Sequence, residues 1–160
     1  MKYSRFEELP VWKDAIELAV RIFKLTMHAS FRQYRSARDQ LERAGMSISN
    51  NIAEGFERGT TAETLAFLYI ARGSAGESRS VLCLCERLPG PGDDLKSEIS
   101  DLKTRAEKIS RQLSAWCRSL QNSDIRGQRY LTNKSRTKTK EDRERAEFLK
   151  ELEEIRSRKP

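Results

Sequence analysis

The sequence contains a single histidine, His28, among its 160 residues. Histidine is the side chain whose ordinary pKa lies nearest neutrality, so the chain has little equipment for general acid–base catalysis. No nucleophile or orienting partner lies near His28, and we interpret it as a surface or interface residue. The chain also lacks the motifs GxxxxGKS/T and HExxH, and it has no GxGxxG after a strand. These absences predict that the protein is not an enzyme, with no catalytic residue and no cofactor.

Cysteine is scarce, and its three positions do not form a disulfide pattern. Cys83 and Cys85 are separated by one residue, and Cys117 is left over. Side chains two positions apart on a helix diverge by roughly 200°, so this pair cannot share a tetrahedral zinc ion. We therefore expect buried thiols, no metal site, and a reducing, cytoplasmic location.

Long apolar runs are also missing. No segment approaches the ~18 consecutive apolar residues that a bilayer-spanning helix needs, and residues 1–5 lead into no apolar signal core. We expect no membrane association. Only four prolines and eight glycines interrupt the chain, which leaves long stretches free for helix.

Apolar residues recur at three- and four-residue steps through the first 120 positions, which is typical of amphipathic helices. We expect helices over about 10–27, 36–58, 61–88 and 95–120. Thr60 and Glu63 form a capping box, and Asp93 or Asp94 can cap the fourth helix. That helix carries a continuous heptad seam: Leu95, Ile99, Leu102, Ala106, Ile109, Leu113, Trp116 and Leu120. The pattern predicts an all-α fold, an antiparallel up-down-up-down four-helix bundle over 1–120.

Two features of the predicted helices point to close packing. Gly45 and Gly55 lie inside the second helix, where each costs on the order of 1 kcal/mol relative to alanine. We expect a neighbouring backbone to pass close to both glycines. The third helix is apolar nearly all round, which indicates a partner subunit as well as an intramolecular core.

The last 40 residues form a basic C-terminal extension. Residues 121–160 hold 12 of the 31 Lys and Arg and 8 of the 24 Asp and Glu, which is more than half of the net charge of +7. Residues 121–140 are polar and nearly free of apolar side chains, so we expect a flexible basic linker. Residues 141–160 are expected to be a short helix or a disordered tail, since Phe148, Leu149, Leu152 and Ile155 share one helical face.

Polar residues lie where the centre of the bundle is expected. We predict a hydrogen-bonded structural network between helices or subunits, because buried polar groups are costly unless paired. Its members are Ser47, Asn51, Glu54, Arg72, Ser74 and Glu77. In an alternative interpretation, Glu54 and Glu77 act as metal ligands or as an acid–base pair, although a di-metal bundle normally also uses histidine.

Three runs of residues resemble a known bacterial family. They are Phe6-x-x-Leu9-x-x-Trp12, Gln40-x-x-Arg43-Ala44-x-x-Ser47-Ile48-x-x-Asn51-Ile52-Ala53-Glu54-Gly55-x-x-Arg58 and Phe67-Leu68-x-Ile70-Ala71-Arg72-Gly73-Ser74-x-x-Glu77. They resemble the four-helix-bundle proteins encoded in intervening sequences of large-subunit ribosomal RNA genes. The chain is also similar to the accessory variability determinant (Avd) proteins of diversity-generating retroelements. The resemblance covers about residues 5–120.

The resemblance implies a ring-like homopentamer with a basic surface that binds nucleic acid. In the retroelement branch it also implies binding to a reverse transcriptase and its template RNA, and it brings no catalytic residue. The chain departs from the family pattern in two places. Residues 28–35 lack the usual Phe-Pro and Tyr-Gly-Leu pattern, and the extension is longer than in most members.

Two groups of basic residues are candidates for nucleic-acid binding, because multiplying a charge of +7 by several subunits gives a large positive field. The candidates are Arg32, Arg35, Arg38, Arg126, Arg129, Lys134, Arg136, Lys138 and Lys140. Tyr34 and Tyr130 are the aromatic residues interleaved with them. The alternatives are a solvated charged face on a protein–protein scaffold, or an intervening-sequence-encoded protein with no RNA function.

Overall fold

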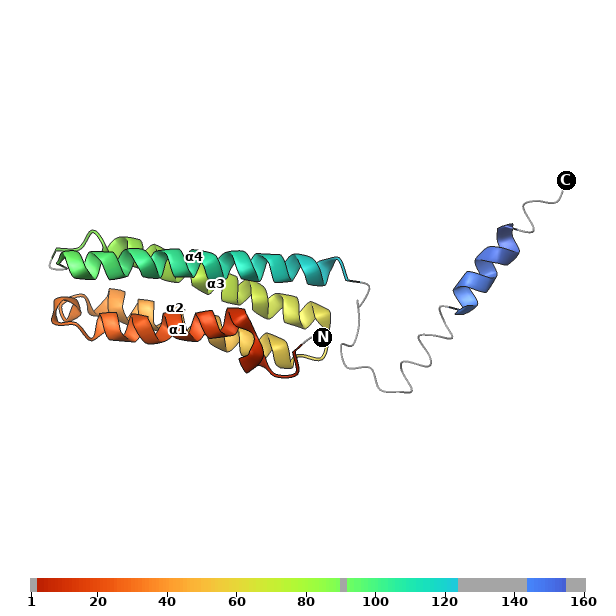
Figure 1. The fold of residues 1–160 in the computed structure, drawn as a ribbon, viewed down its shortest axis with the longest axis horizontal. Coiled ribbons are helices and arrows are strands. Elements are labelled where there is room, and N and C mark those ends of the chain that lie inside the picture. The colour runs from red at the N-terminus through yellow and green to blue at the C-terminus, as the bar shows by residue number, and fades with distance from the viewer. Residues whose placement is uncertain (1–2, 90–91, 124–143, 155–160) are drawn as a thin grey trace. The chain divides into compact units, whose positions relative to one another are not determined.

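The computed structural model describes residues 3–89, 92–123 and 144–154. The chain divides into two compact units, Met1–Gly127 and Gln128–Pro160. The first unit contains two short 3-10 helices, η1 and η2, and four long helices (Figure 1). In chain order these elements are η1 (Phe6–Glu8), α1 (Pro10–Thr26), η2 (Ala29–Phe31), α2 (Arg35–Glu57), α3 (Thr61–Cys85) and α4 (Asp93–Gln121).

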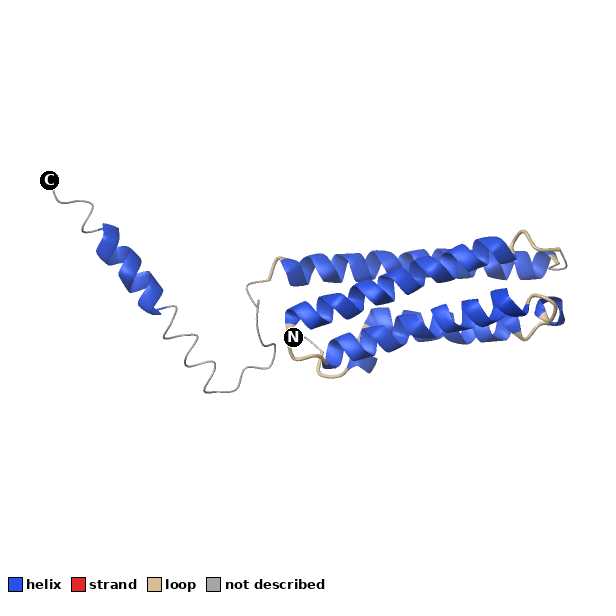
Figure 2. Cartoon of the chain, turned by 180° about the vertical axis from the view of Figure 1, so that it is seen from behind, coloured by secondary structure: helices blue, strands red, loops and turns tan. Residues whose placement is uncertain are grey.

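The four long helices form the predicted bundle. Successive helices run in opposite directions, α2 packs on both α1 and α3, and α4 closes the bundle against α1 and α3. Within the described residues the structure contains helices and loops but no strand (Figure 2). The all-α, up-down-up-down prediction is therefore confirmed.

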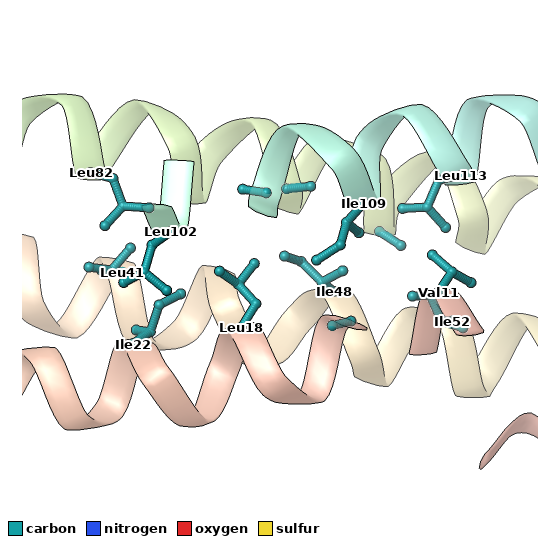
Figure 3. Packing of buried hydrophobic residues seen from close by; sticks show 14 of the residues in the cluster. Val11, Leu18, Ile22, Leu41, Ile48, Ile52, Leu82, Leu102, Ile109 and Leu113 are labelled. Atoms are coloured by element: carbon teal, nitrogen blue, oxygen red, sulfur yellow. The ribbon is translucent and has the colours of Figure 1, made fainter. Parts of the chain in front are cut away.

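One hydrophobic core runs along the axis of the bundle. Side chains of all four helices point into it, including Leu18, Ile48, Leu82 and Ile109 (Figure 3). The heptad seam of α4 supplies the fully buried residues Ile99, Leu102, Ala106, Ile109 and Leu113. Burial of each large aliphatic side chain contributes about 1.5–3 kcal/mol, so this seam is a major part of what holds α4 in place.

The ends of the helices agree with most of the sequence signals. Pro10 lies in the first turn of α1, and the Thr60 side chain caps α3 by accepting a hydrogen bond from the Glu63 backbone N–H at 3.3 Å. The cap predicted for the fourth helix is wrong. Gly92 is the N-cap residue of α4, and Asp93 already belongs to the helix. Glycine is also tolerated at N-caps, but aspartate is preferred there. The sequence therefore favoured one of the two aspartates that follow Gly92.

The two glycines inside α2 lie against neighbouring helices, but the predicted close backbone contact is found at Gly55 and not at Gly45. A Cβ atom at Gly45 would lie 2.8 Å from the Cδ1 atom of Ile22, on α1. A Cβ atom at Gly55 would lie 2.9 Å from the Cβ atom of Phe67 and 3.3 Å from the carbonyl oxygen of Thr64, on α3. The absence of a side chain at Gly55 therefore sets how closely α2 and α3 pack.

A polar clamp joins α1 to α4 outside the core. The Arg21 guanidinium donates to the Glu98 carboxylate from Nε at 2.9 Å and from Nη2 at 2.6 Å, and its Nη1 donates to Asp101 at 2.6 Å. The hydrogen bonds with Glu98 are the main cause of a raised Arg21 pKa. Such a two-pronged contact fixes geometry as well as charge, so it helps to set the register of α1 on α4.

The second unit contains a helix at 144–154, inside the predicted range. Its residues are all exposed, including Phe148, Leu149 and Leu152. Ile155, the fourth member of the predicted apolar face, lies outside the described residues. None of the described helices is long and apolar enough to cross a membrane.

The two glycine contacts predict unequal costs for one substitution. Gly55→Ala should lower the free energy of unfolding by about 1–2 kcal/mol, because the new methyl group meets a Cβ atom and a carbonyl that cannot rotate away. Gly45→Ala should stay within about 1 kcal/mol of the wild type, since the tip of Ile22 can move and helix propensity improves. Urea unfolding followed by circular dichroism measures both. An equal or smaller loss for Gly55→Ala would contradict this account of α2–α3 packing.

Burial predicts that two of the three thiols are unreactive. Cys85 is fully buried, which raises its pKa to about 11, and burial also raises the pKa of Cys117. Since the thiolate is the reactive form, iodoacetamide should leave both residues unmodified in the folded protein at mildly alkaline pH. Peptide mass spectrometry with and without guanidinium chloride tests this expectation. Modification of Cys85 at the same rate in both samples would show that it is not buried.

Candidate functional site

The lone histidine has a structural role at the end of α1. His28 is the residue before η2, and its Nδ1 atom accepts a hydrogen bond from the backbone N–H of Ser30 at 3.3 Å. The same nitrogen lies 3.1 Å from the Ser30 hydroxyl. His28 is exposed, and no carboxylate among the described residues contacts it. Its side chain acts as the N-cap of η2.

Three of the six predicted network residues come together between α2 and α3. Asn51 Nδ2 donates to Ser47 Oγ at 3.0 Å, and Ser47 Oγ lies 2.9 Å from Ser74 Oγ. Ser74 in turn donates to the carbonyl oxygen of Ile70 at 3.0 Å. Either hydroxyl of the Ser47–Ser74 pair can be the donor; when Ser74 donates to Ile70, Ser47 donates to Ser74. This chain satisfies polar groups in the half-buried seam between the two helices.

The other three predicted members lie outside this network, on the surface. The Glu54 carboxylate pairs with Arg58, the C-cap residue of α2, and Glu77 accepts a hydrogen bond from Gln40. Arg72 is exposed on α3. The sequence spacing predicted the correct helices for these three residues. It did not predict that their long side chains lie on the surface, while the shorter side chains of Ser47, Asn51 and Ser74 lie between α2 and α3.

The structure separates the two carboxylates that were candidates for metal or acid–base chemistry. The Ser47–Ser74 contact sets the register of the antiparallel helices α2 and α3. From this contact Glu54 lies 7 residues along α2 and Glu77 lies 3 residues along α3 in the opposite direction, which at a rise of 1.5 Å per residue corresponds to about 15 Å along the bundle. A shared two-metal site needs ligands around ions about 3.5–4 Å apart, so Glu54 and Glu77 cannot form one. Among the described residues, no three His, Cys, Asp or Glu side chains gather where they could hold a metal ion.

The loop arginines, defined as Arg32, Arg35 and Arg38, all lie at the end of the bundle that contains η2. Arg35 is 83% exposed and has one long contact, 3.7 Å, to Asp39. Arg32 is exposed and makes no ion pair with any described residue. These two guanidinium groups are therefore available to an anion.

Arg38 differs from the other two loop arginines because acidic side chains surround it. It contacts Asp39 at 3.3 Å and Glu42 at 3.9 Å, and only about a third of its side chain is exposed. Glu42 also accepts a hydrogen bond from Thr26 at 2.6 Å, which ties the end of α1 to α2. The position of Arg38 favours a structural role over a phosphate contact.

Sequence reasoning missed two further arginines at this end of the bundle. Tyr34 donates a hydrogen bond to the carbonyl oxygen of Pro89 at 2.8 Å, which brings the start of α2 beside the end of α3. Arg87 and Arg43, both exposed, lie on these two segments. No local pattern marks Arg87, because it joins the loop arginines only through the packing of the two helices, whereas Arg43 follows Arg35 and Arg38 on α2 itself.

The remaining basic candidates lie outside the described residues. They are Arg126, Arg129, Lys134, Arg136, Lys138 and Lys140, together with Tyr130. Their role in binding stays a prediction from the sequence.

Comparison with known proteins identifies a family and a similar fold. Residues 7–115 match the family of 23S rRNA-intervening sequence proteins. A search of curated proteins gives no match. Among solved structures, the chain is similar to a Bacteroides thetaiotaomicron protein of unknown function from the S23 ribosomal protein family, with a TM-score of 0.60 and 25% identity over 67% of this chain and 97% of the other. The matched residues include all of α1, α2 and α3 and most of α4, and the chain belongs to the family of 23S rRNA-intervening sequence proteins.

Proposed function

We propose that this chain is a non-enzymatic, homo-oligomeric accessory protein that binds RNA. The observation that carries the proposal is the exposure of Arg32 and Arg35 at the η2 end of the bundle, where Arg32 pairs with no described acidic residue and Arg35 makes only a 3.7 Å contact with Asp39. RNA phosphates offer the complementary charge, and arginine binds them through paired N–H donors. A family named after 23S rRNA genes supports RNA as the nucleic acid. The basic residues of the extension would add further phosphate contacts.

A homo-oligomer is part of the proposal because one face of α3 stays exposed within the described bundle, although the Tyr69 hydroxyl accepts a hydrogen bond from Gln121 at 2.7 Å. Tyr69 and Ile70 are about half exposed, and a Cβ atom at Gly73 or Gly76 would meet nothing within 4 Å. Exposed apolar side chains beside bare glycines are what a closely packed neighbouring helix requires. The resemblance described above favours five subunits in a ring.

The finer proposal names a reverse transcriptase of a diversity-generating retroelement and its template RNA as the partners. Its support is the similarity of the sequence runs around Asn51 and Gly73 to the accessory variability determinant proteins. A reverse-transcriptase gene and a variable repeat beside this gene would add support. A position inside a ribosomal RNA gene would instead favour an intervening-sequence protein without that partner.

A protein–protein scaffold is the second candidate function, and the exposed apolar face of α3 is the observation that favours it. In that case the face would cover a different protein, and the arginines would serve solubility or bind an acidic partner. Salt dependence separates the two functions, because RNA binding weakens by a fixed slope for each phosphate contacted.

The RNA proposal predicts a loss of both affinity and salt slope. The slope of log affinity against log salt concentration has a magnitude of ~0.7 for each phosphate contact with single-stranded RNA. The double variant Arg32→Ala/Arg35→Ala loses two contacts, so its slope should be smaller in magnitude by about 1.4 for each subunit that contacts the RNA. Replacing the six basic candidates of the extension by glutamine should lower the slope further. Fluorescence anisotropy across a salt series measures these slopes.

Arg111→Ala/Arg118→Ala is the matched control, because it removes the same charge from two exposed positions on α4. Its slope should stay close to that of the wild type. Equal slopes for all variants, or no RNA binding at low salt, would refute the RNA proposal.

The oligomer proposal predicts that a bulky side chain on the bare face of α3 disrupts assembly. Gly73→Leu should reduce the mass in light scattering, while circular dichroism stays helical because the new side chain meets open space within its own chain. Ser100→Leu on an exposed turn of α4 is the control and should leave the mass unchanged. A monomeric wild type, or an unaltered mass for Gly73→Leu, would count against this interface.

A further inference from the structure

A groove opens at the η2 end of the bundle, between the first turns of α2 and the last turns of α3. Its volume is about 390 Å³. Val81, Leu84 and Leu88 supply an apolar wall from the α3 side, and Tyr34 and Gln40 line the opposite side. The groove therefore combines one aromatic ring with an apolar surface and polar groups.

The aromatic side chain of this groove is held in place before any ligand binds. The Tyr34 hydroxyl donates to the carbonyl oxygen of Pro89 at 2.8 Å, which restrains both torsions of the side chain. A ring that is already fixed loses little conformational entropy when a flat ligand stacks on it. This restraint makes Tyr34 a suitable stacking platform.

Four polar side chains line the groove. Tyr34 and Gln40 already have hydrogen-bond partners, and the other two have none within the described ranges. Gln40 donates to Glu77 and accepts from Arg43, so its amide is oriented by its own neighbours. The Gln33 amide and the Ser36 hydroxyl line the groove and have no hydrogen-bond partner among the described residues. An amide and a hydroxyl each offer a donor and an acceptor, which can match the polar edge of a nucleobase.

The charges around the groove favour a polyanion. None of the described arginines lines the groove itself, but Arg32 and Arg35 are next in sequence to the lining residues Gln33, Tyr34 and Ser36. Arg87 follows α3 between the lining residues Leu84 and Leu88, and its guanidinium donates to the carbonyl oxygen of Cys83. Of the nearby carboxylates, Asp39 contacts Arg35 and Arg38, whereas Glu77 accepts a hydrogen bond from the neutral amide of Gln40 and keeps its negative charge. Positive side chains around an aromatic and apolar centre are typical of sites for single-stranded nucleic acid.

From this arrangement we propose that the groove binds an unpaired nucleobase of single-stranded RNA, with the base stacked on Tyr34 and its flanking phosphates on the surrounding arginines. The inference rests on the proposed RNA binding and deepens it, because it specifies the form of RNA. A base inside a duplex is stacked on its neighbours and cannot enter the groove. The site therefore selects single strands, loops or ends.

Binding of a short single-stranded RNA and of its duplex to the full-length oligomer tests the proposal. Tyr34→Ala should weaken single-strand binding by roughly 5- to 150-fold, the range expected from loss of one stacked base. The salt slope and the duplex affinity should not change, because no phosphate contact is lost. Tyr34→Phe keeps the ring and should retain most of the affinity. Tyr3→Ala, in the N-terminal segment, is the matched control and should bind single strands like the wild type.

Photo-crosslinking gives a readout that does not depend on stability. A 4-thiouridine-containing single strand should crosslink to peptides carrying residues 33–40 or 81–88 of the wild type. The outcomes separate the two proposals. If Tyr34→Ala binds single strands normally while Arg32→Ala/Arg35→Ala does not, the groove proposal fails and RNA binding stands. Crosslinks found only elsewhere, or equal losses for single strand and duplex, also overturn the groove proposal. A wild type that binds no RNA at low salt, or only an acidic peptide, overturns both.

Discussion

The close approach of α2 to α3 is the constraint on which the rest of this structure depends. Gly55 lets the two helices meet where Phe67 and Thr64 leave no room for a methyl group. From that point the antiparallel register places Ser47 against Ser74 and Gln40 against Glu77, and it ends with Tyr34 bonded to Pro89. Side chains that lie far apart in the sequence are neighbours because one glycine fixes the distance between two backbones.

This register decides what each polar group can do. Short side chains fill the seam between the helices, where they satisfy one another, while the long charged side chains reach solvent. The two glutamates that seemed a pair along the sequence are held at different levels. At the η2 end, the same register gathers arginines from two helices around an apolar groove. One packing distance thus separates the carboxylates and brings the cations together.

Much of the fold could be predicted because helical periodicity is a local property. The seam of α4 was readable from its heptads, and the close contacts of Gly45 and Gly55 followed from the cost of glycine inside a helix. The groove could not be predicted, because Tyr34 and Pro89 are 55 residues apart in the sequence. The same limit explains why the sequence does not mark Arg87, and why it does not show that Glu54 and Glu77 lie on the surface beside the Ser47–Ser74 hydrogen bonds.

The bare face of α3 has a consequence for motion. Gly73 and Gly76 leave the backbone of this turn without side-chain cover, and glycine gains more conformational freedom on opening than any other residue. Helical hydrogen bonds in the middle of α3 therefore open at a lower cost than they would with alanine at these two positions. A neighbouring subunit that covers this turn would restrain the backbone of α3. Because α3 continues to the η2 end of the bundle, contact between subunits would also make that end more rigid.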